Sequence, residues 1–150
     1  MNISDLRQKA DSGNVAAQAI LGNCYLEGDG VEVNYREAFR LLSAAASQRA
    51  PRAISGLARM YAEGLGTSKD PTQALSLYES AAKSGEFLSQ IELGRIYSRG
   101  IGVQSDPDKA LKWYSAATAQ ASRVQDCEEL REARDYVARA ASLDENRRPD

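Results

Sequence analysis

The sequence predicts an all-helical protein built from three copies of one repeating unit. Six columns of residues recur at a step of 36 positions, with no insertion between copies. Within each unit the apolar residues follow three- and four-residue steps, which place them on one face of a helix. Glycine and cap residues divide every unit into two such helices. The columns are Leu21, Leu57 and Leu93; Tyr25, Tyr61 and Tyr97; Gly28, Gly64 and Gly100; Gly30, Gly66 and Gly102; Ala38, Ala74 and Ala110; and Ala45, Ala81 and Ala117.

The repeat defines the boundaries that we expect within a single domain, residues 1–150. Residues 1–13 are expected to form the helix of a leading half-repeat, because Ala10 and Gly13 match the end of a unit. Repeat units bury their apolar faces only against neighbours, so the last unit needs a cap. The three units cover 14–49, 50–85 and 86–121, a capping helix is expected over 122–142, and a frayed tail over 143–150. The apolar stripe of the cap contains Val124, Cys127, Leu130, Val137 and Ala141.

Each unit carries signals that end the first helix and start the second. The Gly-x-Gly triplet follows the first helix, and glycine is the residue that most easily takes the left-handed conformation of a helix end. We therefore expect positive φ angles at Gly30, Gly66 and Gly102. The second helix starts at Asn34, Asp70 or Asp106, which are good N-caps. Asn34 with Glu37, and Asp70 with Gln73, have the spacing of a capping box.

These motifs resemble those of the Sel-one-like repeat (SLR) family, which is related to the tetratricopeptide repeats. The third unit carries the pattern most fully, with Leu93-Gly94, Tyr97, Gly100-Ile101-Gly102, Asp106, Lys109-Ala110, Trp113-Tyr114 and Ala116-Ala117. The first and third units depart from it at the closing glycine, where Arg49 and Ala121 stand in place of Gly85. The resemblance covers about 14–121 and implies an α-solenoid of stacked antiparallel helix pairs. It also implies a bacterial source.

Several chemical classes are excluded or weakened by the composition. The chain has no histidine, which is the commonest metal ligand and general base. We therefore expect that the protein has no metal site, binds no cofactor and is not an enzyme. The net charge of −2 disfavours nucleic acid as a partner. The two cysteines, Cys24 and Cys127, lack metal-site spacing and are interpreted as half-buried thiols. No membrane span or signal peptide is visible, which predicts a cytoplasmic protein unless a signal peptide has been removed.

One surface of the repeats is a candidate binding site. In the SLR-like arrangement the first helices line a concave groove, and the positions between the core residues should face into it. Arginine suits a carboxylate ligand because its planar fork makes two hydrogen bonds. We therefore expect a protein or peptide partner, with an acidic segment as one candidate. The expected groove residues are Asn23, Arg52, Arg59, Glu63, Leu88, Ile91, Arg95 and Arg99.

These observations bear on three candidate functions. The sequence favours a non-catalytic protein-interaction module that acts as an adaptor, regulator or inhibitor by holding a partner segment in its groove. The first alternative is a structural role, in which open ends stack into a homodimer or a larger assembly. The second is a hydrolase of cell-wall or β-lactam chemistry, which the absence of histidine and of a cysteine pair in each repeat disfavours.

Overall fold

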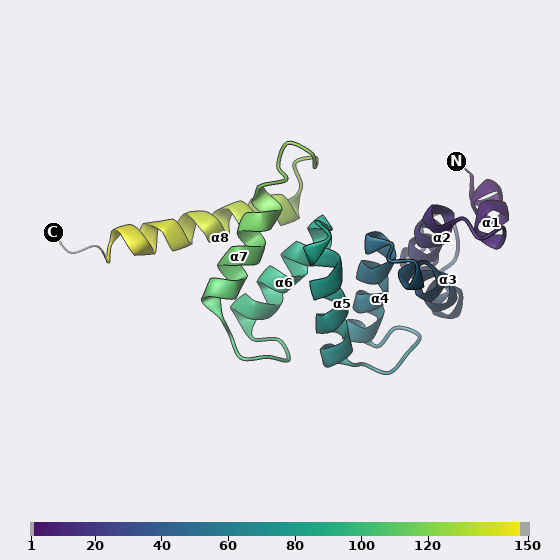
Figure 1. Ribbon diagram of the computed structural model, residues 1–150, viewed down its shortest axis with the longest axis horizontal. Helices are drawn as coiled ribbons and strands as arrows, with labels where there is room; N and C mark the ends of the chain where they lie inside the picture. Colours follow the sequence, from purple (N-terminus) through teal and green to yellow (C-terminus); the bar gives the residue numbers. More distant parts are fainter. Residues whose placement is uncertain (1, 148–150) are drawn as a thin grey trace. The chain divides into compact units, whose positions relative to one another are not determined.

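The computed structural model describes residues 2–147, which contain eight α-helices and no strand (Figure 1). Contacts divide the chain into two compact units, residues 1–86 (unit 1) and 87–150 (unit 2), where we had expected one domain. Such a division is natural for a repeat protein, because each repeat contacts only its neighbours. The helices are α1 (Ile3–Asp11), α2 (Val15–Glu27), α3 (Tyr35–Ser47), α4 (Pro51–Glu63), α5 (Pro71–Lys83), α6 (Phe87–Arg99), α7 (Pro107–Thr118) and α8 (Glu128–Glu145).

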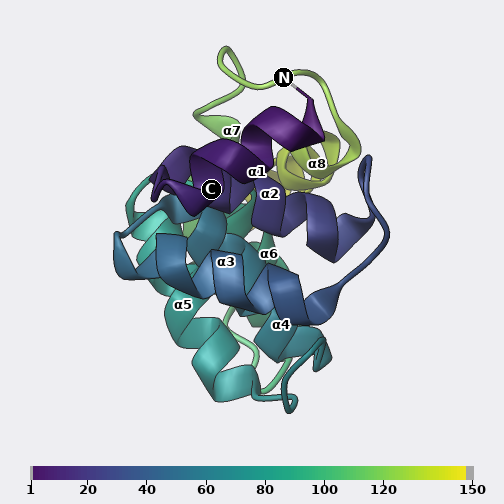
Figure 2. The same ribbon diagram turned by 90° about the vertical axis from the view of Figure 1, so that its right-hand side faces the viewer.

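The helix pairs agree with the predicted repeats. Unit 1 holds α1 and the pairs α2–α3 and α4–α5, and Figure 2 shows α1 beside α2 and α3 beside α4. Unit 2 holds the pair α6–α7 and α8, which packs mainly on α7. The expected fold class, an α-solenoid of antiparallel helix pairs, is confirmed. Helix α1 falls within the expected half-repeat and buries Leu6 and Ala10 against α2 and α3.

The second helices begin as predicted, but the capping boxes are only half formed. The side chains of Asn34, Asp70 and Asp106 each accept a hydrogen bond from the backbone N–H three residues later. Their own backbone N–H groups donate to the carbonyl oxygens of Tyr25, Tyr61 and Tyr97, at 2.9, 2.8 and 2.9 Å. The N–H that Glu37 would bind in a capping box is therefore already satisfied, and the Glu37 carboxylate pairs with Arg40 instead.

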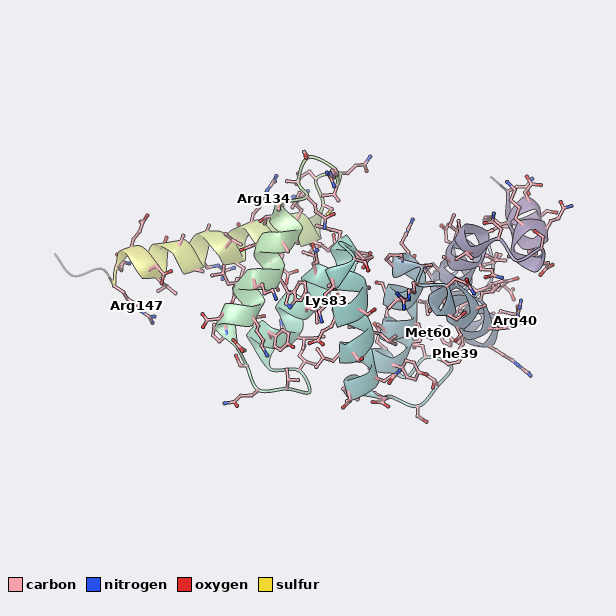
Figure 3. The ribbon with its side chains drawn as sticks, in the orientation of Figure 1. Phe39, Arg40, Met60, Lys83, Arg134 and Arg147 are labelled. Atoms are coloured by element: carbon pink, nitrogen blue, oxygen red, sulfur yellow. The ribbon has the colours of Figure 1, made fainter. Side chains whose placement is uncertain are left out.

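Close contact between the two helices of a pair depends on small residues in the first. A Cβ atom on Gly22 would lie 2.8 Å from Leu42, and one on Gly94 would lie 2.7 Å from the ring of Tyr114. Large side chains of the second helix thus fill the space that glycine leaves. Figure 3 shows Met60 and Phe39 where α4 meets α3, in the core of unit 1, and Arg40 on its outer surface.

The tyrosine column is buried to different degrees in the three repeats. Tyr97 is 6% exposed, whereas Tyr25 and Tyr61 are half-buried. The ring of Tyr61 meets Phe39 edge to face, with centroids 5.9 Å apart. The side chain of Tyr61 is therefore only partly buried in the core of unit 1.

The capping helix starts later and ends later than expected. We predicted it over 122–142, whereas α8 spans Glu128–Glu145, so part of the expected tail is helical; 148–150 lie outside the described residues. Val124 and Cys127 are not in the helix, since turns cover 119–123, Val124 lies in a bend and Cys127 is the extended N-cap of α8. Leu130 and Ala133 are buried and Ala141 is exposed. The periodic pattern extended the helix too far because it ignored these turns.

Replacing Arg49 with glycine is expected to stabilise unit 1 by about 1 kcal/mol. Arg49 has a φ of 59°, the left-handed region that costs an L-residue about 1–2 kcal/mol. Glycine takes this conformation freely, although it also loses more entropy on folding. Urea unfolding followed by circular dichroism measures the change. The matched control is Gln48→Gly, at a φ of −93°, which should destabilise. A loss of stability in Arg49→Gly would contradict this assignment.

Candidate partner-binding site

The first helices of unit 1 present a mixed polar face. Arg59 on α4 has its Nε 3.1 Å from Glu63 on the same helix and its Nη1 3.5 Å from Glu27 on α2. Arg52 is exposed and has no ion pair with any residue from 2 to 147. Exposed pairs of this kind contribute about 0–1 kcal/mol, so another carboxylate could exchange into them at low cost. Ile20, 41% exposed, adds an apolar patch to the α2 part of this face.

Asn23 has a structural role that the sequence analysis did not foresee. Its Nδ2 donates to the carbonyl oxygens of Ala19, at 3.0 Å, and Arg52, at 3.5 Å. Its Oδ1 lies 2.5 Å from the point where a Cβ of Gly56 would stand. Asn23 therefore connects α2 to α4, and its amide is not turned outward as a free donor.

Unit 2 contains a connected polar group that is centred on Glu132 of α8. Arg95 on α6 donates from Nε to both Glu132 carboxylate oxygens, at 3.1 and 3.0 Å, and from Nη2 at 2.6 Å. The hydroxyl of Tyr114 on α7 donates to Oε1 at 2.9 Å. Arg95 also pairs with Glu92, at 2.6 Å. Charge-assisted, fork-shaped pairs such as this are the strong ones, and this one connects α8 to both helices of the repeat.

Ionisation in this group follows from these contacts. The hydrogen bonds from Arg95 hold the pKa of Glu132 below its ordinary value, and the Glu132 contact raises the pKa of Arg95. Burial, followed by the hydrogen bond to Glu132, raises the pKa of Tyr114 to about 12. At neutral pH the group thus contains a carboxylate, a guanidinium cation and a neutral phenol.

Two of the expected groove residues in unit 2 need correction. Ile91 is fully buried in a core cluster with Tyr114, Ala117 and Ala133, so it lines no surface. Arg95 was expected to be free in a groove, but it is held by Glu92 and Glu132, since α8 covers it. Reversing its charge would therefore disturb the contact with α8. Leu88 and Arg99 are exposed.

An open pocket of about 400 Å³ lies beside the Glu132 group. Arg99 is the one lining residue among the expected groove residues; Tyr114 was noted only as a motif residue of the third repeat, and no polar residue of α8 was proposed for the site. No fixed spacing could reveal the lining residues of α8, since this helix lies outside the 36-residue repeat. The pocket is lined by Ser98, Arg99, Tyr114, Glu128, Glu132, Tyr136 and Arg139.

Glu132→Gln is expected to lower the stability of unit 2 at pH 7 and to lower it less at pH 3. A carboxyl group whose pKa is lowered by folding stabilises the folded state above its unfolded pKa, about 4.3. This contribution disappears as the pH falls through the lower folded pKa. Urea unfolding followed by the fluorescence of Trp113, the one tryptophan, reports on unit 2. Glu128→Gln, an exposed change on the same helix, is the control. An equal deficit at both pH values would contradict the pairing as the cause.

Comparison with known proteins identifies the family. The model of the Sel1 repeat matches residues 15–49, 51–86 and 88–122. The chain belongs to the Sel1 repeat family. The SLR resemblance drawn from the motifs is thereby confirmed, with repeat boundaries within two residues of those expected. No curated protein matches the chain.

Two bacterial Sel1-repeat structures are similar to this one. The crystal structure of a Sel1 repeat protein from Oxalobacter formigenes is 44% identical, with a TM-score of 0.69, and the match covers 89% of this chain and 97% of that one. The protective antigen c5321, present in uropathogenic Escherichia coli strains, displays an SLR fold and is 34% identical, with a TM-score of 0.70. That match covers 77% of this chain and 25% of the antigen.

Sel1-repeat solenoids are in general scaffolds for protein–protein interaction and are typically non-catalytic. In residues 2–147, no three His, Cys, Asp or Glu side chains group as the ligands of a metal ion would. No helix of the same range has both the length and the apolar character needed to cross a membrane.

Proposed function

We propose that this Sel1-repeat chain is a non-catalytic adaptor or regulator that binds a segment of a partner protein along the first helices of its repeats. The family supports a protein partner, and the lack of histidine disfavours acid–base or nucleophilic catalysis.

The observation that carries this proposal is the contrast between two kinds of column. Several core columns keep their residue through all three repeats, as leucine does at Leu21, Leu57 and Leu93. Outward columns on the same helices change chemistry from one repeat to the next. Exposed positions that vary in this way from one repeat to the next suit recognition of one particular segment. Two such columns are exposed in all three repeats: Ala16, Arg52 and Leu88; and Glu27, Glu63 and Arg99.

The exposed chemistry of unit 1 supports the same proposal. Ile20 offers apolar contact, while Arg52 and Arg59 offer guanidinium donors that are exposed or held only by surface ion pairs. A partner segment with apolar and acidic residues would complement this face.

The test compares quantitative capture of partners by two charge-changed variants. The face variant carries Ile20→Lys with Arg52→Glu, and the control carries Gln73→Glu with Ser76→Glu on exposed positions of α5. We expect one partner to be retained by wild type and control but lost from the face variant, with all three equally helical by circular dichroism. Equal capture by wild type and both variants would remove this face as the binding site.

We expect the chain to be monomeric at micromolar concentration, against the self-assembling alternative. Stacking through the N-terminal edge would need an apolar outer surface on α1. Its exposed residues are instead polar or charged: Ser4, Asp5, Arg7, Gln8, Lys9 and Asp11. Light scattering over a hundredfold range of concentration measures the mass. A mass that rises with concentration in the wild type, but not in the variant Ser4→Arg with Gln8→Arg, would favour assembly through α1.

A further inference from the structure

The carboxylate of Glu132 is bound by donors from the third repeat, as the carboxylate of a separate ligand would be. Its three hydrogen-bond and ion-pair partners, Arg95, Arg99 and Tyr114, all belong to the third Sel1 repeat. Glu132 itself belongs to α8, outside the repeat. The regular repeat thus supplies the donors, and an added helix supplies the carboxylate.

The pocket beside this carboxylate is open and carries two further cations. Arg99 is 64% exposed, and its nearest carboxylate oxygen, on Glu132, is 3.9 Å away. Arg139 is exposed; its Nε donates to the backbone carbonyl of Asp135 at 3.3 Å, and it has no ion pair within the described chain. The acidic side chains in the lining are Glu128 and Glu132, and Arg95 already neutralises Glu132. A second carboxylate entering this pocket would therefore meet unsatisfied guanidinium donors.

We propose that the third repeat is a receptor for glutamate side chains of an acidic partner segment, and that Glu132 occupies this site in the free protein. One partner glutamate exchanges with Glu132 at Arg95 and Tyr114, while Arg99 and Arg139 hold a neighbouring carboxylate at the rim. This inference rests on the proposed function, because the ligand is a segment of a partner protein. It adds the chemistry of that segment and an internal competitor.

The geometry favours a side-chain carboxylate over a phosphate group. The carboxylate that the site holds is that of a glutamate, with both oxygens bound by the fork of Arg95. Glu128 at the pocket and Glu92 beside Arg95 would oppose the larger charge of a phosphate.

Competition by Glu132 predicts opposite effects for two sets of variants. A site that is occupied internally binds its ligand more weakly, by the fraction of molecules in which it is free. Removing the Glu132 charge should therefore strengthen binding of an acidic peptide. Removing the cations at the rim should weaken it.

The experiment is a fluorescence anisotropy titration with a labelled peptide that contains six glutamates separated by serine and has an amidated C-terminus. We expect Glu132→Gln to bind about tenfold more tightly than wild type, and the pair Arg99→Gln, Arg139→Gln about tenfold more weakly, within the usual range of coupling between sites. A peptide with glutamine in place of glutamate should not bind.

Matched controls separate the site from general electrostatics. Glu92→Gln removes the same charge beside Arg95 but does not line the pocket, and we expect less than a threefold gain. The pair Arg131→Gln, Arg134→Gln removes two charges from α8 that are paired with Asp126 outside the pocket, and we expect less than a threefold loss.

Several results would overturn the inference. Unchanged or weaker peptide binding by Glu132→Gln would show that Glu132 only holds α8 on the third repeat and does not compete with the peptide. If Glu132→Gln does not fold, the double variant Arg99→Gln, Arg139→Gln still tests the site, because both residues are exposed. Equal affinity of this double variant and the wild type for the peptide would reject the site. Equal binding of a glutamine peptide with a free C-terminus would assign the site to a terminal carboxylate. None of these results bears on binding by the unit 1 face. The proposed function is tested separately, by the capture experiment.

Discussion

Replacing Tyr114 with alanine is expected to lower the free energy of unfolding of unit 2 by about 3–5 kcal/mol. Tyr114 is 2% exposed and fills the space above Gly94, where no side chain stands. Its ring also stacks on Tyr136 of α8, with centroids 4.7 Å apart. The substitution therefore opens a cavity between α6 and α7 and removes a contact that holds α8.

Two comparison variants test the contribution of the Tyr114 hydroxyl group and the effect of how deeply the ring is buried. Tyr114→Phe keeps the ring but loses the bond to Glu132, and we expect a cost of about 1 kcal/mol. Tyr61→Ala removes a half-buried ring from the same kind of repeat in unit 1, so its cost should be clearly smaller. Urea unfolding followed by circular dichroism measures all three. Equal losses for Tyr61→Ala and Tyr114→Ala would contradict the difference in burial.

Gly66→Val is expected to destabilise unit 1 by about 1–3 kcal/mol from backbone strain, with a further loss from steric contact. Gly66 has a φ of 67°, a conformation that β-branched residues very rarely take. A Cβ atom there would lie 2.8 Å from the Cβ of Tyr35 and 3.0 Å from its backbone oxygen. Backbone cannot move aside as a flexible side chain can.

Gly13→Val is the matched control for Gly66→Val. Gly13 has a φ of 87°, yet a Cβ atom there would meet nothing within 4 Å. The control therefore measures the strain alone, and the difference between the two variants measures the contact with Tyr35. Identical unfolding midpoints for the two variants would show that the turn relaxes around the new side chain.

Much of the fold could be read from sequence, because its signals are local. The N-caps at Asn34, Asp70 and Asp106 act within one turn of helix, and all three accept the predicted bond. Gly30, Gly66 and Gly102 have φ angles of 69, 67 and 70°, as expected for the shared turn. Each of these features depends on residues a few positions apart, and the 36-residue step repeats the evidence three times.

The candidate site was the part that local signals missed. The predicted groove included Arg59, which is accessible, but also Ile91, which is core. Ile91 is four residues from Arg95, the equivalent of Arg59 in the third repeat, so the two positions are only about 40° apart around the helix. A small rotation of the helix therefore exchanges surface for interior. Only contact with α7 and α8 decides which residue is covered.

The sequence by itself determined the repeat, its helix pairs, their caps and turns, and therefore the family. The tertiary structure decided where α8 begins, which residues its polar side chains meet, and the half-formed capping boxes. These depend on partners far apart in the chain: Arg95 meets Glu132 37 residues away, and the N–H of Asn34 reaches the carbonyl of Tyr25. A hydrogen bond or ion pair needs atoms within about 3–4 Å, and no periodicity in a sequence specifies such a distance between helices.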